Sequence, residues 1–222
     1  MRFDMDQLTG RDRYKLITGV VVPRPIALVT TLDGAGGVNA APFSFFNAMG
    51  ADPALIVLGI GNKTREEPKD TAKYIRASGE FVVNIVTEDI AERMNITSVD
   101  FPAGVDELAI AGLTGVPSSI VRPPRVAESP VNMECREVQT MEIGRNRIIF
   151  GEVLVMHIRD DLVDAEKFYV HTDKLHAVGR MHAPGWYTTT NDCFEMPRMT
   201  HADWEKLGGA PHRPPSPSDH RA

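Results

Sequence analysis

Residues 131–158 constrain the fold of this chain more than any other segment. Val131, Met133 and Cys135 alternate with polar side chains, which is the two-residue period of a strand with one buried face. The turn signal Gly144-Arg145-Asn146-Arg147 separates this run from a second apolar run over residues 148–158. The segment therefore predicts a long antiparallel hairpin.

Shorter elements precede the hairpin. Apolar, β-branched runs over residues 26–31, 54–60 and 81–86 predict three strands. A helix is predicted with Asp70 or Thr71 as its N-cap and Ala77 as its last residue, because Ser78-Gly79 follows. Residues 88–95 predict a second helix, and the Pro- and Gly-rich residues 98–130 predict an ordered connection with few chemical clues.

Several strands joined by turns, with few helices, predict a mainly β (α+β) fold. We expect an antiparallel, closed or partly closed β-barrel with a few peripheral helices, and not a doubly wound parallel sheet. The 222 residues fit one domain, which we expect to span residues 1–207. Residues 208–222 are rich in proline and polar side chains and are expected to form a tail or arm.

Composition excludes several classes of protein. Hydrophobic content is 42%, mean hydropathy is −0.18, and no apolar run approaches the roughly 20 residues of a membrane helix. The first residues lack the apolar core of a signal peptide, so we expect a cytoplasmic protein. A formal charge of −6 argues against a nucleic-acid partner. Cys135 and Cys193 are far apart and are expected to be reduced thiols that bind no metal.

The run Asn39-Ala40-Ala41-Pro42-Phe43-Ser44-Phe45-Phe46-Asn47 predicts a binding site for a flat ligand with polar edges. Its aromatic rings offer apolar surface, its small residues let backbone amides approach, and its Asn and Ser side chains can fix a ligand's orientation. The pattern leaves open which of Phe43, Phe45 and Phe46 faces the ligand and which faces the core.

A group of cations precedes the helix predicted at Asp70. Lys63, Arg65 and Lys69 lie just before a helix N-terminus, where unpaired amides and a partial positive charge favour a phosphate. The same residues are compatible with a helix capped by Asp70 and flanked by solvated surface charges. The residues alone leave both interpretations open.

Other patterns carry less weight. Gly59-Ile60-Gly61 follows a strand but opens no helix, so it is a poor dinucleotide fingerprint. His171, His176, His182 and His201 match no metal-ligand spacing, and His157 is expected to be a hydrogen-bonded structural residue. Arg180 follows Gly179 and can reach a ligand oxygen or remain a surface residue.

Taken in order, several of these motifs resemble the flavin reductase-like family, the FMN-binding split-barrel proteins that include flavoredoxins. The resemblance rests on Pro23 to Thr31, Asn39 to Asn47, Lys69-Asp70-Thr71, Glu80 to Asn84, Gly151-Glu152-Val153 and Val178-Gly179-Arg180. It covers residues 14–196 and implies an FMN-binding split β-barrel of antiparallel Greek-key type. The chain departs from the family's pattern after Arg180, where the resemblance leaves open whether the Trp186-Tyr187 pair lines the flavin or the nicotinamide side.

The resemblance also implies a site and an assembly. It implies that FMN lies at a homodimer interface, in contact with Thr30, Thr31, Asn39, Ala41, Ser44, Phe45, Asn47, Arg65, Lys69, Asp70 and Thr71. The phosphate interpretation of the cations before the helix is then the favoured one. Arg180 is added to this set as a residue that can reach a ligand oxygen.

The function that this resemblance implies is an NAD(P)H-dependent oxidoreductase. Hydride would pass from NADH or NADPH to FMN, and electrons would continue to a small acceptor or a partner protein. One alternative is an FMN-carrying electron-transfer or flavin-binding protein with no nicotinamide activity of its own. A second alternative is a structural β-barrel that binds no flavin.

Overall fold

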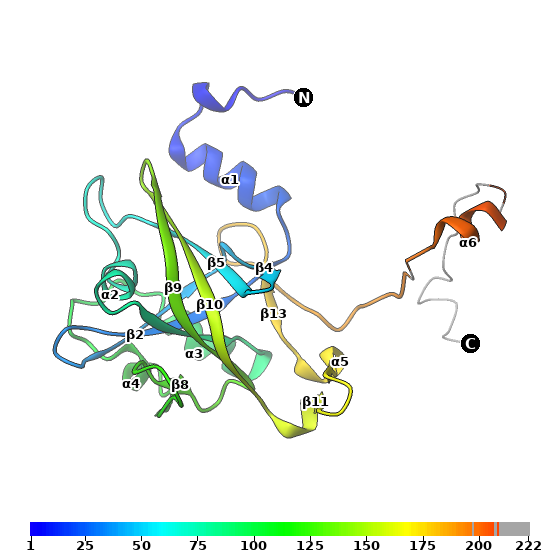
Figure 1. The fold of residues 1–222 in the computed structure, drawn as a ribbon. Coiled ribbons are helices and arrows are strands. Elements are labelled where there is room, and N and C mark those ends of the chain that lie inside the picture. Colours follow the sequence, from blue (N-terminus) through cyan, green and yellow to red (C-terminus); the bar gives the residue numbers. More distant parts are fainter. Residues whose placement is uncertain (197, 207, 209–222) are drawn as a thin grey trace. The chain divides into compact units, whose positions relative to one another are not determined.

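Seven antiparallel strands form the main sheet of the chain. The computed structural model describes residues 1–196, 198–206 and 208. The sheet has the strand order β3-β2-β6-β9-β10-β5-β4 (Figure 1). Its strands are β2 (Ala27–Leu32), β3 (Val38–Phe43), β4 (Phe46–Ala51), β5 (Ala54–Gly61), β6 (Glu80–Ile85), β9 (Val131–Ile143) and β10 (Asn146–Ile158).

The predicted hairpin is confirmed. Strands β9 and β10 pair from Ile143 with Asn146 at the turn to Val131 with Ile158 at the far end. The register shifts between Phe150 and Gly151, where a β-carbon on the glycine would come within 2.4 Å of the Phe81 ring. Glycine at position 151 therefore lets the Phe81 side chain pack directly against the strand.

The sheet curls around a single apolar core. One cluster of buried residues draws members from all seven strands and from helix α2 (Asp70–Ser78). The two edge strands of the sheet, β3 and β4, both contribute to this cluster, through Phe43 and Phe46 respectively. The inner face of the sheet is therefore closed on itself, as in a barrel, with α2 contributing Ala72 and Ile75.

Helix α2 packs against the core of this barrel, and other helices cover part of its outer face. Helix α2 ends at Gly79, whose φ of 72° suits glycine, close to the predicted end. The predicted second helix is a 3₁₀ turn, η2 (Glu88–Ile90), followed by α3 (Ala91–Ile96). Together with α4 (Glu107–Ile110), these elements pack on the outer face of β2 and β3 in a second apolar cluster that contains Leu28, Ala40 and Leu108.

The remaining elements are short, apart from the N-terminal helix α1 (Gly10–Val20), which buries only Thr18. They are η1 (Met5–Gln7), β1 (Arg24–Pro25), β7 (Gly115–Val116), β8 (Arg125–Val126), η3 (Asp160–Leu162), β11 (Val163–Asp164), β12 (Tyr169–Val170), α5 (Thr172–Leu175), β13 (Val178–Arg180) and β14 (Tyr187–Thr189). Strands β1, β13 and β14 form a small separate sheet. Within the described residues, no helix has the length and apolar character needed to cross a membrane.

The chain divides into two compact units. The first spans Met1–Thr189 and contains the barrel. The second begins at Thr190 and includes helix α6 (His201–Lys206). The tail predicted over residues 208–222 lies outside the described residues, except for Gly208.

Candidate functional site

Two cavities meet beside strand β3 and together form the candidate site. The larger has a volume of about 440 Å³ and the smaller about 90 Å³. Pro42 and Ser98 line both, so the cavities are two lobes of one site. The larger lobe is lined by Tyr14, Ile26, Pro42, Ser44, Met94, Asn95, Ser98, Arg180, Pro184, Gly185 and Tyr187. The smaller lobe is lined by Asn39, Ala41, Pro42, Lys63, Lys69, Asp70, Thr71, Thr97, Ser98, Val99, Asp100, Phe101 and Glu107.

A buried hydrogen-bonded trio joins the sheet to the start of helix α2 at the smaller lobe. Thr31 of β2 lies opposite Asn39 of β3 in the antiparallel register. The Asn39 amide Nδ2 donates to the hydroxyl of Thr31 at 3.0 Å and to that of Thr71 at 3.1 Å. Asn39 and Thr71 are therefore fixed in place where they line the lobe.

Charged side chains surround the N-terminus of α2. The helix begins at Asp70 and its N-cap is Lys69, not Asp70 or Thr71 as predicted, and no side-chain hydrogen bond caps it. The Asp70 carboxylate instead pairs with the ammonium groups of Lys63 and Lys73. Burial alone would raise the pKa of Asp70, but the hydrogen bonds from Lys63 and Lys73 outweigh it and lower that pKa.

The smaller lobe contains carboxylates as well as cations. Lys63 and Lys69 line it together with Asp70, Asp100 and Glu107. The Glu107 Oε2 atom accepts a hydrogen bond from the Ala40 amide at 3.0 Å. Burial raises the pKa of Glu107, because its charged form loses contact with water.

Beneath the larger lobe, Arg24 ties three segments together. Its Nη1 donates to the carbonyl oxygens of Thr18 and Val21, and its Nη2 donates to that of Met181 at 2.7 Å. Its Nε donates to the Ser44 hydroxyl at 3.4 Å. Arg24 is only 5% exposed, and burial lowers the pKa of its guanidinium. The contact positions Ser44 on the floor of the lobe.

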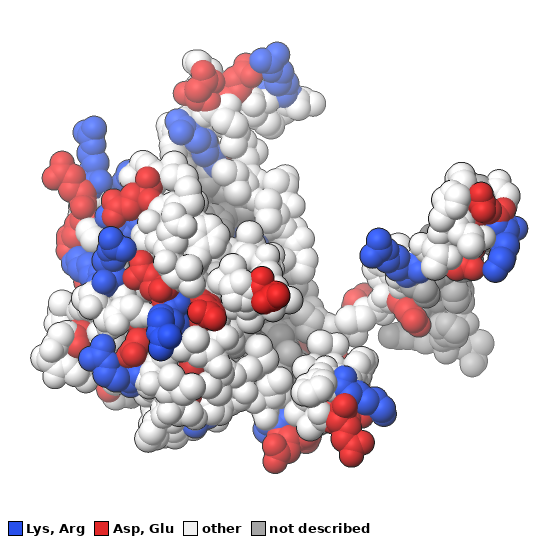
Figure 2. All heavy atoms as spheres, in the orientation of Figure 1, with Lys and Arg blue, Asp and Glu red and all other residues white. Residues whose placement is uncertain are grey.

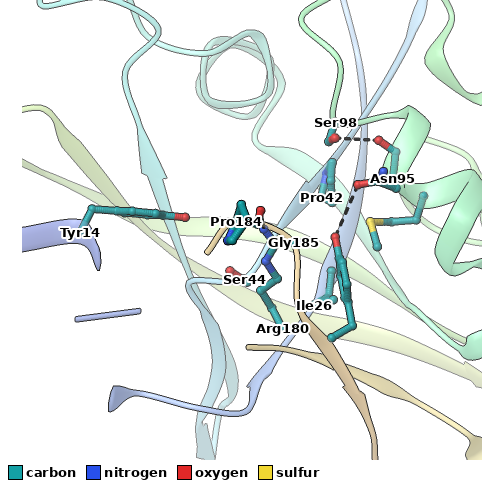
Figure 3. Close-up of a pocket in the computed structure, with 11 residues that line it drawn as sticks. Tyr14, Ile26, Pro42, Ser44, Asn95, Ser98, Arg180, Pro184 and Gly185 are labelled. Carbon is teal, nitrogen blue, oxygen red and sulfur yellow. Dashed lines mark hydrogen bonds between the residues drawn. The ribbon is translucent and has the colours of Figure 1, made fainter. Parts of the chain in front are cut away.

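The turn between β13 and β14 forms one wall of the larger lobe. The Arg180 guanidinium lies 4.6 Å from the centre of the Tyr187 ring and donates to the Pro184 carbonyl at 3.0 Å. The Tyr187 hydroxyl reaches Asn95 Oδ1 at 3.5 Å. Figure 3 shows Tyr14 on one side of the lobe, Asn95 and Ser98 on the other, and Arg180 near Ser44 between them.

Seven of the twelve predicted site residues line the two lobes. Asn39, Ala41, Lys69, Asp70 and Thr71 lie in the smaller lobe, and Ser44 and Arg180 in the larger. Thr31 touches the site through Asn39, whereas Thr30 lies on the opposite face of β2 and donates to the Pro124 carbonyl.

The other three predicted residues lie outside both lobes. Phe45 is 41% exposed, and its ring centre lies 6.2 Å from that of Tyr14. The Asn47 side chain accepts a hydrogen bond from the Ala48 amide. Arg65 is exposed in the loop before α2. The structure thus brings Lys63, not Arg65, to the lobe beside Lys69.

Residues 95–107 form a wall of the site that the sequence did not predict. Asn95 and Ser98 line the larger lobe, and Phe101 and Glu107 line the smaller. The sequence does contain a helix-start signal here, since the Asp106 carboxylate accepts from the Ala109 amide. That signal indicates the helix α4 but not its position against β3.

Comparisons with known proteins agree on one family. Residues 20–179 match the model of the flavin reductase like domain. A relative from Deinococcus radiodurans is 47% identical over 210 residues, which cover 92% of this chain and 92% of the relative. A relative from Bacillus subtilis is 38% identical over 202 residues, which cover 88% of this chain and 98% of the relative.

Solved structures extend the agreement. The nitrilotriacetate monooxygenase component B from Bacillus cereus is 30% identical, with a TM-score of 0.85 over 88% of this chain and 98% of that one. The 2-nitrobenzoate 2-nitroreductase NbaA from Pseudomonas fluorescens is 38% identical, with a TM-score of 0.82 over 90% of this chain and 98% of that one. A flavin reductase structure with a split barrel domain from Shewanella frigidimarina has a TM-score of 0.78 over 90% of this chain and 100% of that one. It is 22% identical, so it supports the fold alone. The predicted split-barrel fold is confirmed.

Proposed function

The chain belongs to the flavin reductase-like family, and on that premise we propose that it is an oxidoreductase that binds FMN in the two joined lobes. The observation that carries this proposal is the contrast between the lobes. The smaller lobe has lysines at a helix N-terminus, whereas the described residues that line the larger lobe have aromatic, apolar and neutral polar side chains apart from one charged residue, Arg180. One ligand with a phosphate at one end and a flat ring at the other would suit both.

The smaller lobe fits a phosphate group. The first residues of helix α2, Asp70 and Thr71, line the lobe together with Lys63 and Lys69, and a helix N-terminus favours an anion. The Thr71 hydroxyl is held by Asn39 at the same place. Asp70 is neutralised by Lys63 and Lys73, so its charge opposes a bound anion less than an unpaired carboxylate would.

The larger lobe fits a planar ring. Its volume of about 440 Å³ lies within the roughly 300–1,000 Å³ of typical small-molecule sites. Ile26, Pro42 and Met94 provide apolar surface, and Ser44 and Asn95 provide hydrogen-bonding groups at its edge. When bound, FMN would accept a hydride, that is two electrons and a proton, from NADH or NADPH, which would leave as the oxidised nucleotide. The chain's residues would orient the ring and limit access of water.

A stopped-flow experiment tests the reductase proposal. FMN-loaded protein mixed with NADH or NADPH should lose its flavin absorbance near 450 nm, because hydride transfer reduces the ring. The expected result is bleaching by at least one of the two nucleotides. If neither bleaches the flavin while a reduced protein donor does, the protein is an electron carrier without nicotinamide activity.

A homodimer is part of the proposal. Strand β4 is the last strand of the sheet and is exposed from Asn47 to Ala51, with Met49 57% exposed. Apolar side chains of the hairpin and of α1, such as Val138 and Ile17, are also exposed. Figure 2 shows few charged side chains over β10, β5 and β4, compared with the region around α2. An uncovered apolar face of this kind supports association with a second copy.

Light scattering of the FMN-loaded protein at micromolar concentration tests this assembly. We expect a mass of twice the 24.5 kDa chain. Introducing a charge at the exposed face, as in Met49→Glu, should shift the mass toward the monomer, whereas Lys167→Glu in a distant exposed loop should not. A monomeric mass for the unaltered protein with FMN fully bound would reject the dimer.

A further inference from the structure

A separate cavity, here called the helix–hairpin cavity, lies between helix α2 and the turn end of the β9–β10 hairpin. Its volume of about 350 Å³ is within the roughly 300–1,000 Å³ of small-molecule sites. None of the described residues that line it also lines a lobe of the proposed flavin site. Pro68, Ala72 and Ala77 give it an apolar surface. The cavity can therefore hold the apolar part of a second ligand.

Cations outnumber carboxylates around the helix–hairpin cavity. Lys73, Arg76 and Arg147 line it, whereas Glu142 is the one carboxylate among its described lining residues. Lys73 and Arg76 also pair with carboxylates that do not line the cavity, but both cations are accessible to solvent. Exposed ion pairs are weak because water screens them, so a ligand anion can compete for these cations.

Arg147 is the residue that most strongly indicates a ligand. Its side chain is only 17% exposed, yet its one hydrogen bond to the described residues runs from Nη1 to Asn62 Oδ1. Its Nε lies 3.6 Å from the Glu142 carboxylate, too far for a hydrogen bond. A guanidinium has five N–H donors, so most of those of Arg147 remain available. Because no buried side-chain nitrogen or oxygen in the described part of the chain lacks a partner, these donors are open to solvent.

We propose that the helix–hairpin cavity binds a small monocarboxylate with an apolar body. The apolar body lies against the proline and the two alanines of the lining, and the carboxylate accepts hydrogen bonds from Arg147 and pairs with Lys73. A planar guanidinium matches the shape of a carboxylate. A single negative charge is also repelled less by the nearby Glu142 than the two charges of a phosphate would be.

An ion-pair chain joins this cavity to the smaller lobe. Lys73 Nζ lies 3.1 Å from Asp70 Oδ1, and the other carboxylate oxygen of Asp70 pairs with Lys63, which lines the smaller lobe. A ligand carboxylate that takes Lys73 leaves Asp70 less neutralised, so Asp70 opposes the flavin phosphate more strongly. Occupation of the cavity therefore weakens the binding of FMN but not that of riboflavin. This coupling rests on the proposed function, whereas the carboxylate site itself does not.

NMR titrations of the flavin-free, full-length protein test the carboxylate site. Hexanoate and its neutral analogue hexanamide are the probes, and the shifts of backbone amides measure each Kd. We expect hexanoate to bind about tenfold tighter than hexanamide, as one partly buried charged hydrogen bond gives. The shifts should concentrate in α2 and in the turn end of the hairpin.

Two variants examine the charge and the space of the cavity separately. Arg147→Gln keeps polar length but removes the charge, so hexanoate should lose its preference over hexanamide. Ala77→Leu fills the cavity from an exposed helix position and should weaken both ligands. Arg159→Gln, at an exposed arginine paired with Asp161, is the matched control and should retain the preference. Circular dichroism checks that each variant is folded.

Flavin titrations at increasing hexanoate concentrations test the coupling. The Kd for FMN should rise to a plateau about fivefold higher, at the low end for coupling between two sites, while the Kd for riboflavin stays constant. A Kd for FMN that rises without limit would instead show that hexanoate competes for the smaller lobe, which contradicts the proposal.

The proposal is also overturned by equal binding of hexanoate and hexanamide, or by a preference that persists in Arg147→Gln. A Kd for FMN that does not respond to hexanoate would refute the link through Asp70. Failure of the unaltered protein to bind FMN would reject the proposed function, and the titrations of the flavin-free protein would still decide the carboxylate site. The two failures are therefore distinguishable.

Discussion

Replacing Lys63 and Lys69 together by alanine should weaken FMN binding about 100-fold and change riboflavin binding less than threefold. Both side chains line the smaller lobe at the start of α2, and only FMN carries a phosphate to meet them. Each lost charge contact should cost about tenfold in affinity, or about 1.4 kcal/mol. Fluorescence titration of both flavins measures the effect.

Three further variants sharpen this prediction. Arg65→Ala should leave the FMN-to-riboflavin ratio nearly unchanged, because Arg65 is exposed outside the lobe. Glu107→Gln should change the ratio in FMN's favour, since it removes a negative charge from the lobe and keeps the acceptor for Ala40. Lys167→Ala is the matched surface control. If the double variant lost equal affinity for FMN and riboflavin, the phosphate would not bind beside Lys63 and Lys69.

Glu134→Gln should lower the free energy of unfolding at pH 7 by about 2–3 kcal/mol, an effect at the upper end for a single substitution. Glu134 is fully buried, and its carboxylate accepts hydrogen bonds from the amides of Ser119, Ile120 and Val121. His157 Nε2 lies 2.7 Å from its Oε1. The carboxylate thus fastens the connection after β7 to the long hairpin.

The stabilisation by the Glu134 carboxylate should depend on pH. Burial alone would raise the pKa of Glu134, but the hydrogen bonds from Ser119, His157, Ile120 and Val121 lower it from 4.5 to about 2. Because the folded pKa lies below the unfolded one, the stabilisation is complete above pH 4.5 and is lost as the pH falls toward 2. At about 1.4 kcal/mol for each pKa unit, the full contribution is about 3 kcal/mol.

Urea unfolding at pH 7 and at pH 3 measures both effects. The difference between the unaltered protein and Glu134→Gln should shrink on acidification, because at pH 3 the Glu134 carboxylate is protonated in the unfolded state, and this favours unfolding. Glu166→Gln, at an exposed carboxylate in the turn between β11 and β12, should change neither value by more than about 0.5 kcal/mol. If the free energy of unfolding differs between the unaltered protein and Glu134→Gln by the same amount at both pH values, the charge of the Glu134 carboxylate is not responsible for the difference.

The long hairpin and the strands with strong local patterns could be predicted from the sequence. The apolar alternation in residues 131–158 is a local property, and the structure places β9 and β10 over nearly the same residues. Helix α1 was not predicted; it buries only Thr18, and its apolar side chains Tyr14 and Ile17 are exposed. Its start does carry a signal, since the Thr9 hydroxyl accepts a hydrogen bond from the Asp12 amide.

The site could be predicted only in part, for reasons of geometry. Thr30 and Thr31 are neighbours in a strand, so their side chains point to opposite faces and only Thr31 meets Asn39. Lys63 and Arg65 are two residues apart in one loop, and the conformation of that loop brings only Lys63 to the lobe. Residues 95–107 reach the site through tertiary contacts such as that of Glu107 with Ala40, which no local pattern indicates.

A crystal structure of the chain with FMN would test the central claim most directly. The account predicts the phosphate beside Lys69 and the first amides of α2, and the flavin ring in the larger lobe next to Ser44. Electron density for the phosphate at Arg180, or for the ring outside the two lobes, would contradict it.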